Sequence, residues 1–144
     1  MQALRWIVLI VISCWLMASC LLGLRADEPN PIGVQWRLTG MERDGHALAL
    51  VAGSRITLMI DADGRARGNA SINSYFGTAV VHADGAIAWP GAFGSTRMAG
   101  SPERMDEEMS YLDALPHTVR WRLDGGDLVL ESADGRTRLT FSAR

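Results

Sequence analysis

Cysteine is nearly absent from this chain, and lysine is absent altogether. The two cysteines, Cys14 and Cys20, both lie in an apolar N-terminal segment, so the rest of the chain contains no thiol. An internal disulfide, a cysteine nucleophile and a cysteine-ligated zinc site are therefore excluded for the globular part. Residues 27–144 carry 12 arginines and 16 acidic residues, which leaves a formal charge of −4. This balance argues against a nucleic-acid-binding domain, because such domains carry a basic excess.

Recognisable catalytic and metal-binding motifs are also missing. His46, His82 and His117 lie far apart in the chain and show no spacing typical of metal ligands. Residues 61–64 begin like a calcium-binding loop, but Ile72 occupies the position that needs a bidentate carboxylate, so we interpret the segment as a turn. No nucleophilic serine motif and no glycine-rich phosphate loop is present. We therefore expect no enzymatic activity, no metal and no cofactor.

The N-terminus has the order of an export signal, with a short basic start, a long apolar run and then polar residues. The sequence LMASC at 16–20 resembles a bacterial lipobox, which predicts cleavage and lipidation at Cys20. Two alternatives are cleavage after Ala26 and retention of the apolar run as a membrane-spanning helix. All three place the domain outside the cytoplasm, with residues 1–26 as signal or anchor. Lipidation is favoured, and because no aspartate follows the acceptor cysteine, we expect the periplasmic face of the outer membrane.

After this segment, residues 27–34 lack periodicity and contain two prolines, so we expect a short extended tether before a domain at 35–144. Within the domain, segments of alternating apolar and polar residues end at pairs typical of β-hairpin turns. These pairs are Asp44-Gly45, Asp63-Gly64, Asp84-Gly85, Gly125-Gly126 and Asp134-Gly135.

One segment follows the helical period instead. Ser101 suits a helix N-cap and Pro102 suits the first helical position, and the helix is expected to end near Leu115. The sequence therefore predicts an α+β domain. It consists of a small antiparallel sheet, or a partly open barrel, of seven to eight strands with one amphipathic helix packed on it.

The expected helix has an apolar and an acidic side. Met105, Met109 and Leu112 recur at helical spacing, so we expect them to pack on the sheet. The three acids at 106–108 occupy successive positions and are interpreted as a solvated surface.

Arginines recur in pairs spaced by two, which places both side chains of a pair on one face of a strand. The pairs are Arg65 and Arg67, Arg120 and Arg122, and Arg136 and Arg138. A solvated face balanced by acidic neighbours is the simpler interpretation. The alternative is a basic stripe that binds anionic lipid headgroups or an acidic partner, formed by Arg120, Arg122, Arg136 and Arg138.

Three separated blocks of the chain resemble the META domain family, which includes the bacterial heat-shock protein HslJ. The blocks are GNASINSYFG at 68–77, STRMA at 95–99 and the acidic helix that follows. The matching residues are Gly68, Asn69, Asn73, Tyr75 and Gly77, then Ser95, Thr96, Met98 and Ala99, then Glu108, Tyr111, Leu112 and Leu115. The resemblance covers about residues 34–142. Ile72 and Gly100 stand where many members carry cysteines, so this domain lacks the disulfide bond that those cysteines would form.

The resemblance implies an envelope protein, often a lipoprotein, associated with heat-shock response or antibiotic resistance and without established catalysis. It gives no functional residues to carry over, and the motif residues are expected to be structural. We therefore expect a non-enzymatic, membrane-anchored and monomeric module that binds a lipid, a hydrophobic ligand or an envelope protein. One alternative is a pilot-like lipoprotein that assists secretin assembly. Another is a hydrolase whose site is assembled from separated loops.

Overall fold

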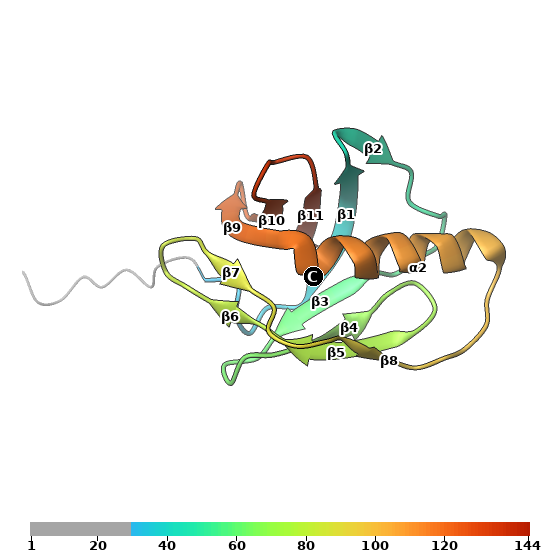
Figure 1. Ribbon diagram of the computed structural model, residues 1–144, viewed down its shortest axis with the longest axis horizontal. Helices are drawn as coiled ribbons and strands as arrows, with labels where there is room; N and C mark the ends of the chain where they lie inside the picture. The colour runs from blue at the N-terminus through green and yellow to red at the C-terminus, as the bar shows by residue number, and fades with distance from the viewer. Residues whose placement is uncertain (1–29) are drawn as a thin grey trace, which may run out of the picture.

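The computed structural model describes residues 30–144 as one antiparallel sheet that curves around one helix, with a small hairpin at one end (Figure 1). The strands are β1 (Trp36–Arg43), β2 (His46–Leu48), β3 (Thr57–Ile60), β4 (Arg65–Asn69), β5 (Ser74–Thr78), β6 (Val80–Val81), β7 (Ile87–Ala88), β8 (Gly94–Ser95), β9 (Thr118–Asp124), β10 (Asp127–Ser132) and β11 (Arg138–Ala143). The helix α2 (Pro102–Ala114) continues into the 3₁₀ turn η1 (Leu115–His117). Within residues 30–144 no helix is long and apolar enough to cross a membrane. The predicted signal segment and Cys20 lie outside the described residues.

The main sheet has the strand order β8-β5-β4-β3-β1-β11-β10-β9, with β2 paired to the outer end of β1, and it does not close into a barrel. This confirms the predicted α+β class. The main sheet holds nine strands, slightly more than predicted, and β6 and β7 form a separate pair. The additional strands β2 and β8 are only three and two residues long. They are too short to show an alternating pattern and depend on pairing with distant segments.

The hairpin turns fall where the sequence predicted them. The turn between β3 and β4 shows why glycine is needed in these hairpins. Gly64 donates its backbone N–H to the Asp61 carbonyl at 2.9 Å and has a φ of +83°. A side chain there would be strained by the positive φ and would also meet the Ala79 carbonyl at 2.8 Å. The Asp-Gly pairs are therefore a local determinant of this fold.

The end of the predicted tether is part of the domain, which corrects the expected boundary. Pro31 is fully buried, and its carbonyl accepts a hydrogen bond of 2.9 Å from the Trp36 indole. Gly33 donates its N–H to the Ile60 carbonyl at 2.8 Å. These residues gain apolar burial and backbone partners that a solvated tether would not have.

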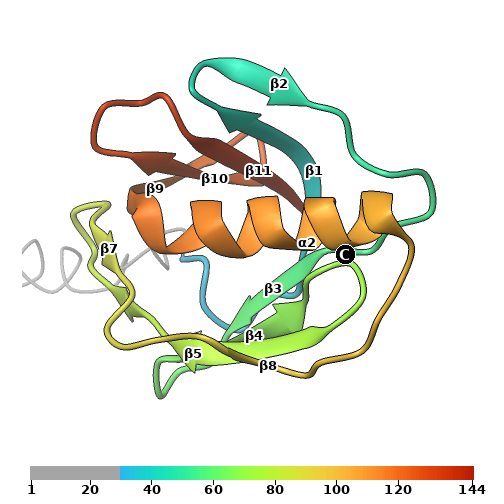
Figure 2. The ribbon, with the colours of Figure 1, turned by 45° about the vertical axis from the view of Figure 1, so that its right-hand side comes forward.

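Helix α2 lies across the curved sheet, between the strands β1, β9, β10 and β11 on one side and β3, β4, β5 and β8 on the other (Figure 2). Its buried side is formed by Glu107, Tyr111 and Ala114, followed by Leu115 of η1. The predicted packing face is wrong for the methionines, because Met105 and Met109 are 46% and 67% exposed, and it is confirmed for Leu112, which is half-buried against the core.

The helix presents polar residues to the interior because each finds a partner there. Oε1 of the Glu107 carboxylate accepts hydrogen bonds from the Val51 N–H at 2.8 Å and the Ser54 hydroxyl at 3.0 Å, whereas its buried Oε2 has no partner within the described residues. The Tyr111 hydroxyl meets that of Tyr75 at 2.7 Å. A buried polar group that is hydrogen-bonded avoids the cost of desolvation, so a tyrosine and a glutamate can occupy positions expected for apolar residues.

Candidate functional site

The three sequence blocks of the predicted family motif come together around one buried asparagine, Asn73. Its side-chain oxygen accepts hydrogen bonds from the Thr96 hydroxyl at 2.8 Å and from the Met98 N–H at 2.7 Å. Its side-chain nitrogen donates to the Met98 carbonyl at 3.1 Å. Asn73 therefore binds both backbone groups of Met98, a residue 25 positions away in the chain.

The third block reaches the same point from helix α2. One Glu108 carboxylate oxygen accepts the N–H groups of Ile72 at 3.2 Å and Asn73 at 2.7 Å, and the other accepts the Asn73 side-chain N–H at 2.8 Å. The interpretation of residues 106–108 as a solvated surface is therefore wrong for Glu107 and Glu108. Glu107 binds the loop at 51–54 and Glu108 binds the loop at 72–73, because these loops lie on two sides of the helix.

This network leaves a methionine-lined groove between α2 and the segment that follows β8. The side chains of Met98, Met105 and Met109 are 58%, 46% and 67% exposed along it, although the backbone of Met98 is held firmly. The groove has a volume of about 650 Å³ and its lining is mainly apolar. It is lined by Asn73, Ser95, Thr96, Arg97, Met98, Ala99, Met105, Glu108, Met109, Leu112 and Asp113. We refer to it below as the methionine groove.

The glycines of the first block allow the close approach of other groups. A Cβ atom on Gly68 would lie 2.7 Å from the Thr57 carbonyl carbon and 3.0 Å from the Tyr75 ring. A Cβ atom on Gly77 would lie 2.6 Å from the Phe93 ring. Gly68 and Gly77 are thus needed for packing between neighbouring segments.

Asn69 and Tyr75 of the same block bind the backbone. The Asn69 side-chain oxygen accepts the Ser71 N–H at 3.0 Å. The Tyr75 hydroxyl donates to the Thr57 carbonyl at 2.9 Å, so the Tyr111 hydroxyl must donate to Tyr75. Burial raises the pKa of both tyrosines. These two hydroxyls therefore act as a directed hydrogen-bond chain in the interior.

Ile72 and Gly100, the two positions where many family members carry cysteines, touch one another. A Cβ atom on Gly100 would lie 2.8 Å from Cγ1 of Ile72. The Ile72 side chain thus fills the space above Gly100, and an apolar contact joins the two loops at this point.

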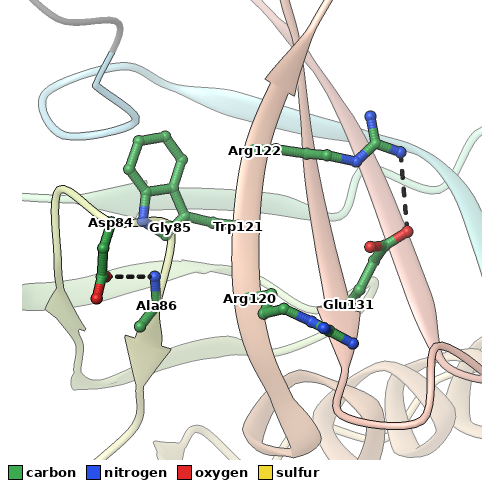
Figure 3. Close-up of a pocket in the computed structure, with 7 residues that line it drawn as sticks. All are labelled: Asp84, Gly85, Ala86, Arg120, Trp121, Arg122 and Glu131. Carbon is green, nitrogen blue, oxygen red and sulfur yellow. Dashed lines mark hydrogen bonds and ion pairs between the residues drawn. The ribbon is translucent and has the colours of Figure 1, made fainter.

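The predicted arginine stripe carries acidic partners. Arg120 and Arg138 both lie opposite Glu131 in the sheet, which places the three side chains on one face. The Glu131 carboxylate accepts a hydrogen bond from Nε of Arg138 at 2.8 Å. It also forms an ion pair with the Arg122 guanidinium group at 3.7 Å (Figure 3). Arg136 lies in the turn before β11. The shared face of Arg120, Arg122 and Arg138 is confirmed, whereas binding of anions by the stripe stays a prediction.

Asp124 and Glu42 add further acids to this face by pairing with Arg122 and Arg138. Arg120 and Arg122 also border a pocket of about 330 Å³ in which Trp121 faces the β6–β7 hairpin (Figure 3). The Trp121 indole donates to the His82 carbonyl at 2.9 Å.

The candidate calcium-binding segment and His117 make local contacts. Segment 61–64 is the β3–β4 turn, where a hydrogen bond from Arg67 lowers the pKa of Asp61. His117 contacts the Asp113 carbonyl through Nδ1 at 2.6 Å. In the part of the chain that the structure describes, no three metal-ligating side chains gather.

Comparisons with known proteins agree on a bacterial fold family. A solved structure described as a protein from Burkholderia xenovorans is similar to this chain, with a TM-score of 0.65 and 27% identity over 85% of this chain and 96% of that one. A DUF4847 family protein from Bacteroides vulgatus gives a TM-score of 0.58 at 14% identity, over 78% of this chain and 93% of that one, which shows likeness of fold. The comparison with curated proteins finds no match.

The family comparison covers the whole described domain. The model of the META domain matches residues 30–144, which include all three motif blocks and the core strands. The match begins at Asn30, in agreement with the packing of Pro31 and Gly33 on the sheet. The chain belongs to the META domain family.

Proposed function

We propose that this protein is a non-enzymatic binding module of the bacterial cell envelope that takes an apolar peptide segment of a protein partner in the methionine groove. The observation that carries the proposal is the exposure of Met98, Met105 and Met109 around a backbone held by Asn73 and Glu108. Unbranched, polarisable methionine side chains adapt to different apolar surfaces, and they are frequent at binding surfaces for peptides.

The shape of the groove favours a peptide over a lipid chain. The groove is a wide, open trough, and beside it lies β8, the terminal strand of the sheet. A terminal strand can pair with an added extended segment, whose alternate side chains would then enter the groove. Arg97 lines the groove and forms no ion pair within the described part of the chain, so an acidic residue next to the apolar segment would complement it.

The localisation follows from the N-terminal sequence. A lipid anchor at Cys20, after removal of the preceding signal, would hold the domain at the periplasmic face of the outer membrane, where it would meet other envelope proteins. Envelope stress tolerance, the role that the family resemblance implies, would then depend on binding and not on catalysis.

Selection from a displayed random peptide library on the purified full chain in detergent tests this proposal. We expect enriched peptides with alternating apolar residues and one acid, and at least a tenfold loss of affinity when Met98, Met105 and Met109 are all replaced by glutamine. Glutamine keeps the length of methionine but removes the apolar end. The matched control replaces Val80 and Val119 by glutamine as well. Both valines are exposed outside the groove, so this variant should bind the peptides as the wild type does.

Equal binding of the enriched peptides to the triple variant would overturn the proposal. So would saturable binding of a fluorescent fatty acid in the groove without any enriched peptide, because a lipid would then be the occupant.

A further inference from the structure

A second pocket, which shares no residue with the methionine groove, is lined by three arginines and by no acidic side chain. It has a volume of about 540 Å³. Its lining is Gln35, Gly53, Arg55, Thr57, Asn69, Ser71, Arg104 and Arg144. We refer to it as the basic pocket. Sequence reasoning missed it because its arginines come from three segments that are about 40 to 90 residues apart in the chain.

The basic pocket brings together three arginines that form no ion pair within the described residues. The ion pairs within residues 30–144 use Arg43, Arg65, Arg67, Arg122 and Arg138, and none uses Arg55, Arg104 or Arg144. This holds although the domain has more acids than arginines. Three like charges around one hollow repel one another, and an anion in that hollow would relieve the repulsion.

The arginines of the basic pocket come from separate elements of the fold. Arg104 lies in the first turn of α2, and its guanidinium group lies over Gly53, with Nη2 at 3.6 Å from the position of a Cβ atom there. Arg144 follows β11 and donates its backbone N–H to the Gln35 carbonyl at 3.1 Å. The pocket is thus built by the helix, the loop before β3 and the end of the last strand.

Ser71 provides an independent observation at the same pocket. It is 7% exposed and has a φ of +98°, a left-handed conformation that is strained for a serine. Its hydroxyl is buried and has no hydrogen-bond partner in the described part of the chain. Strained residues cluster at ligand sites, and a ligand oxygen would provide the missing partner of this hydroxyl once the side chain turns toward the pocket.

We propose that the basic pocket binds a phosphate group, with Arg55 and Arg104 as its principal ligands and Arg144 and Ser71 at its wall. The planar guanidinium group can bind two oxygens of one phosphate at once, which a compact ammonium group cannot do. The volume of about 540 Å³ has room for inorganic phosphate or for a lipid headgroup, and the two probes below distinguish these sources. The proposal does not depend on a peptide in the methionine groove.

Calorimetric titration of the full chain in dodecyl maltoside tests this proposal with two probes. One is inorganic phosphate, and the other is a short-chain phosphatidylglycerol kept below its micelle concentration. We expect one probe molecule per chain and an affinity that falls as salt rises from about 0.05 to 0.3 M, because the Debye length shortens. The Arg55→Gln/Arg104→Gln variant should lose at least tenfold in affinity for the probe that binds.

The matched control is Arg43→Gln/Arg65→Gln, which removes the same charge outside the basic pocket and should stay within twofold of the wild type. Stronger binding of the phosphatidylglycerol identifies a headgroup, whereas binding of inorganic phosphate alone identifies a free anion; both support the site. The proposal is overturned if neither probe binds at low salt, if acetate binds equally well, or if the control loses as much affinity as the pocket variant.

Discussion

Replacing Glu108 by glutamine should destabilise the domain by about 1.5–3 kcal/mol, although this residue looks like an ordinary surface acid in the sequence. The carboxylate faces only donors: two backbone N–H groups on one oxygen and the Asn73 side-chain N–H on the other. Glutamine has one acceptor oxygen, so either orientation of its amide turns an NH₂ group toward a donor. At least one charge-assisted bond is lost, each being worth about 1.5–3 kcal/mol, and the remaining bonds lose their charge.

The measurement is urea unfolding of the full chain in detergent, followed by near-ultraviolet circular dichroism. Asp106→Asn is the matched control, because Asp106 lies on the same helix, is exposed and forms no hydrogen bond or ion pair within residues 30–144. It should change the free energy of unfolding by less than about 0.5 kcal/mol. The Met98 amide, which donates to Asn73, should also exchange its hydrogen faster in Glu108→Gln.

Equal stability of Glu108→Gln and Asp106→Asn, within about 0.5 kcal/mol, would refute this reasoning. It would show that water replaces the carboxylate at no cost, and that the family residues at this point do not hold the groove together.

Four further predictions concern other parts of the chain. Tyr75→Phe should lower the free energy of unfolding more than Tyr111→Phe, because it deprives both the Tyr111 hydroxyl and the Thr57 carbonyl of their partner. Urea unfolding of the two single variants and of the double variant measures the difference. Because the pKa of both tyrosines is raised, the folded state keeps protons that the unfolded state loses above about pH 10. The free energy of unfolding should therefore fall as the pH rises above about 10, and it should fall less steeply in the Tyr75→Phe/Tyr111→Phe variant. Ile72→Cys with Gly100→Cys should form a disulfide under oxidising conditions and raise stability by about 3–4 kcal/mol over the reduced form, measured by unfolding with and without reductant. Cys20→Ala should leave an unprocessed precursor detectable by mass spectrometry, and a wild-type N-terminus at residue 27 would contradict lipidation.

Local patterns determined most of the strands and the helix. Asp-Gly pairs such as Asp63-Gly64 favour hairpins through backbone conformations that glycine adopts freely, and this preference needs no distant partner. Alternating residues in β11 likewise indicated which side chains face the core, as shown by the complete burial of Leu139 and Phe141, whereas Trp121 and Leu123 of β9 are half-buried. The order of the three motif blocks was sufficient to indicate the META domain.

The tertiary structure alone decided which side of the helix is buried. Helical spacing favoured Met105 and Met109, but Tyr111 and Glu107 are buried instead, because Tyr75 and the loop at 51–54 supply hydrogen-bond partners. These partners lie 36 to 56 residues away in the chain, so no local pattern reveals them.

The same physical reason applies to the charged residues. Whether an arginine is free or paired depends on the strands and loops that fold beside it: Arg138 has Glu131 as its cross-strand neighbour, whereas Arg55 and Arg104 meet around a pocket without an acid. Charge and spacing along the chain are local properties, but neutralisation is set by distances between segments that only the folded sheet and helix bring together.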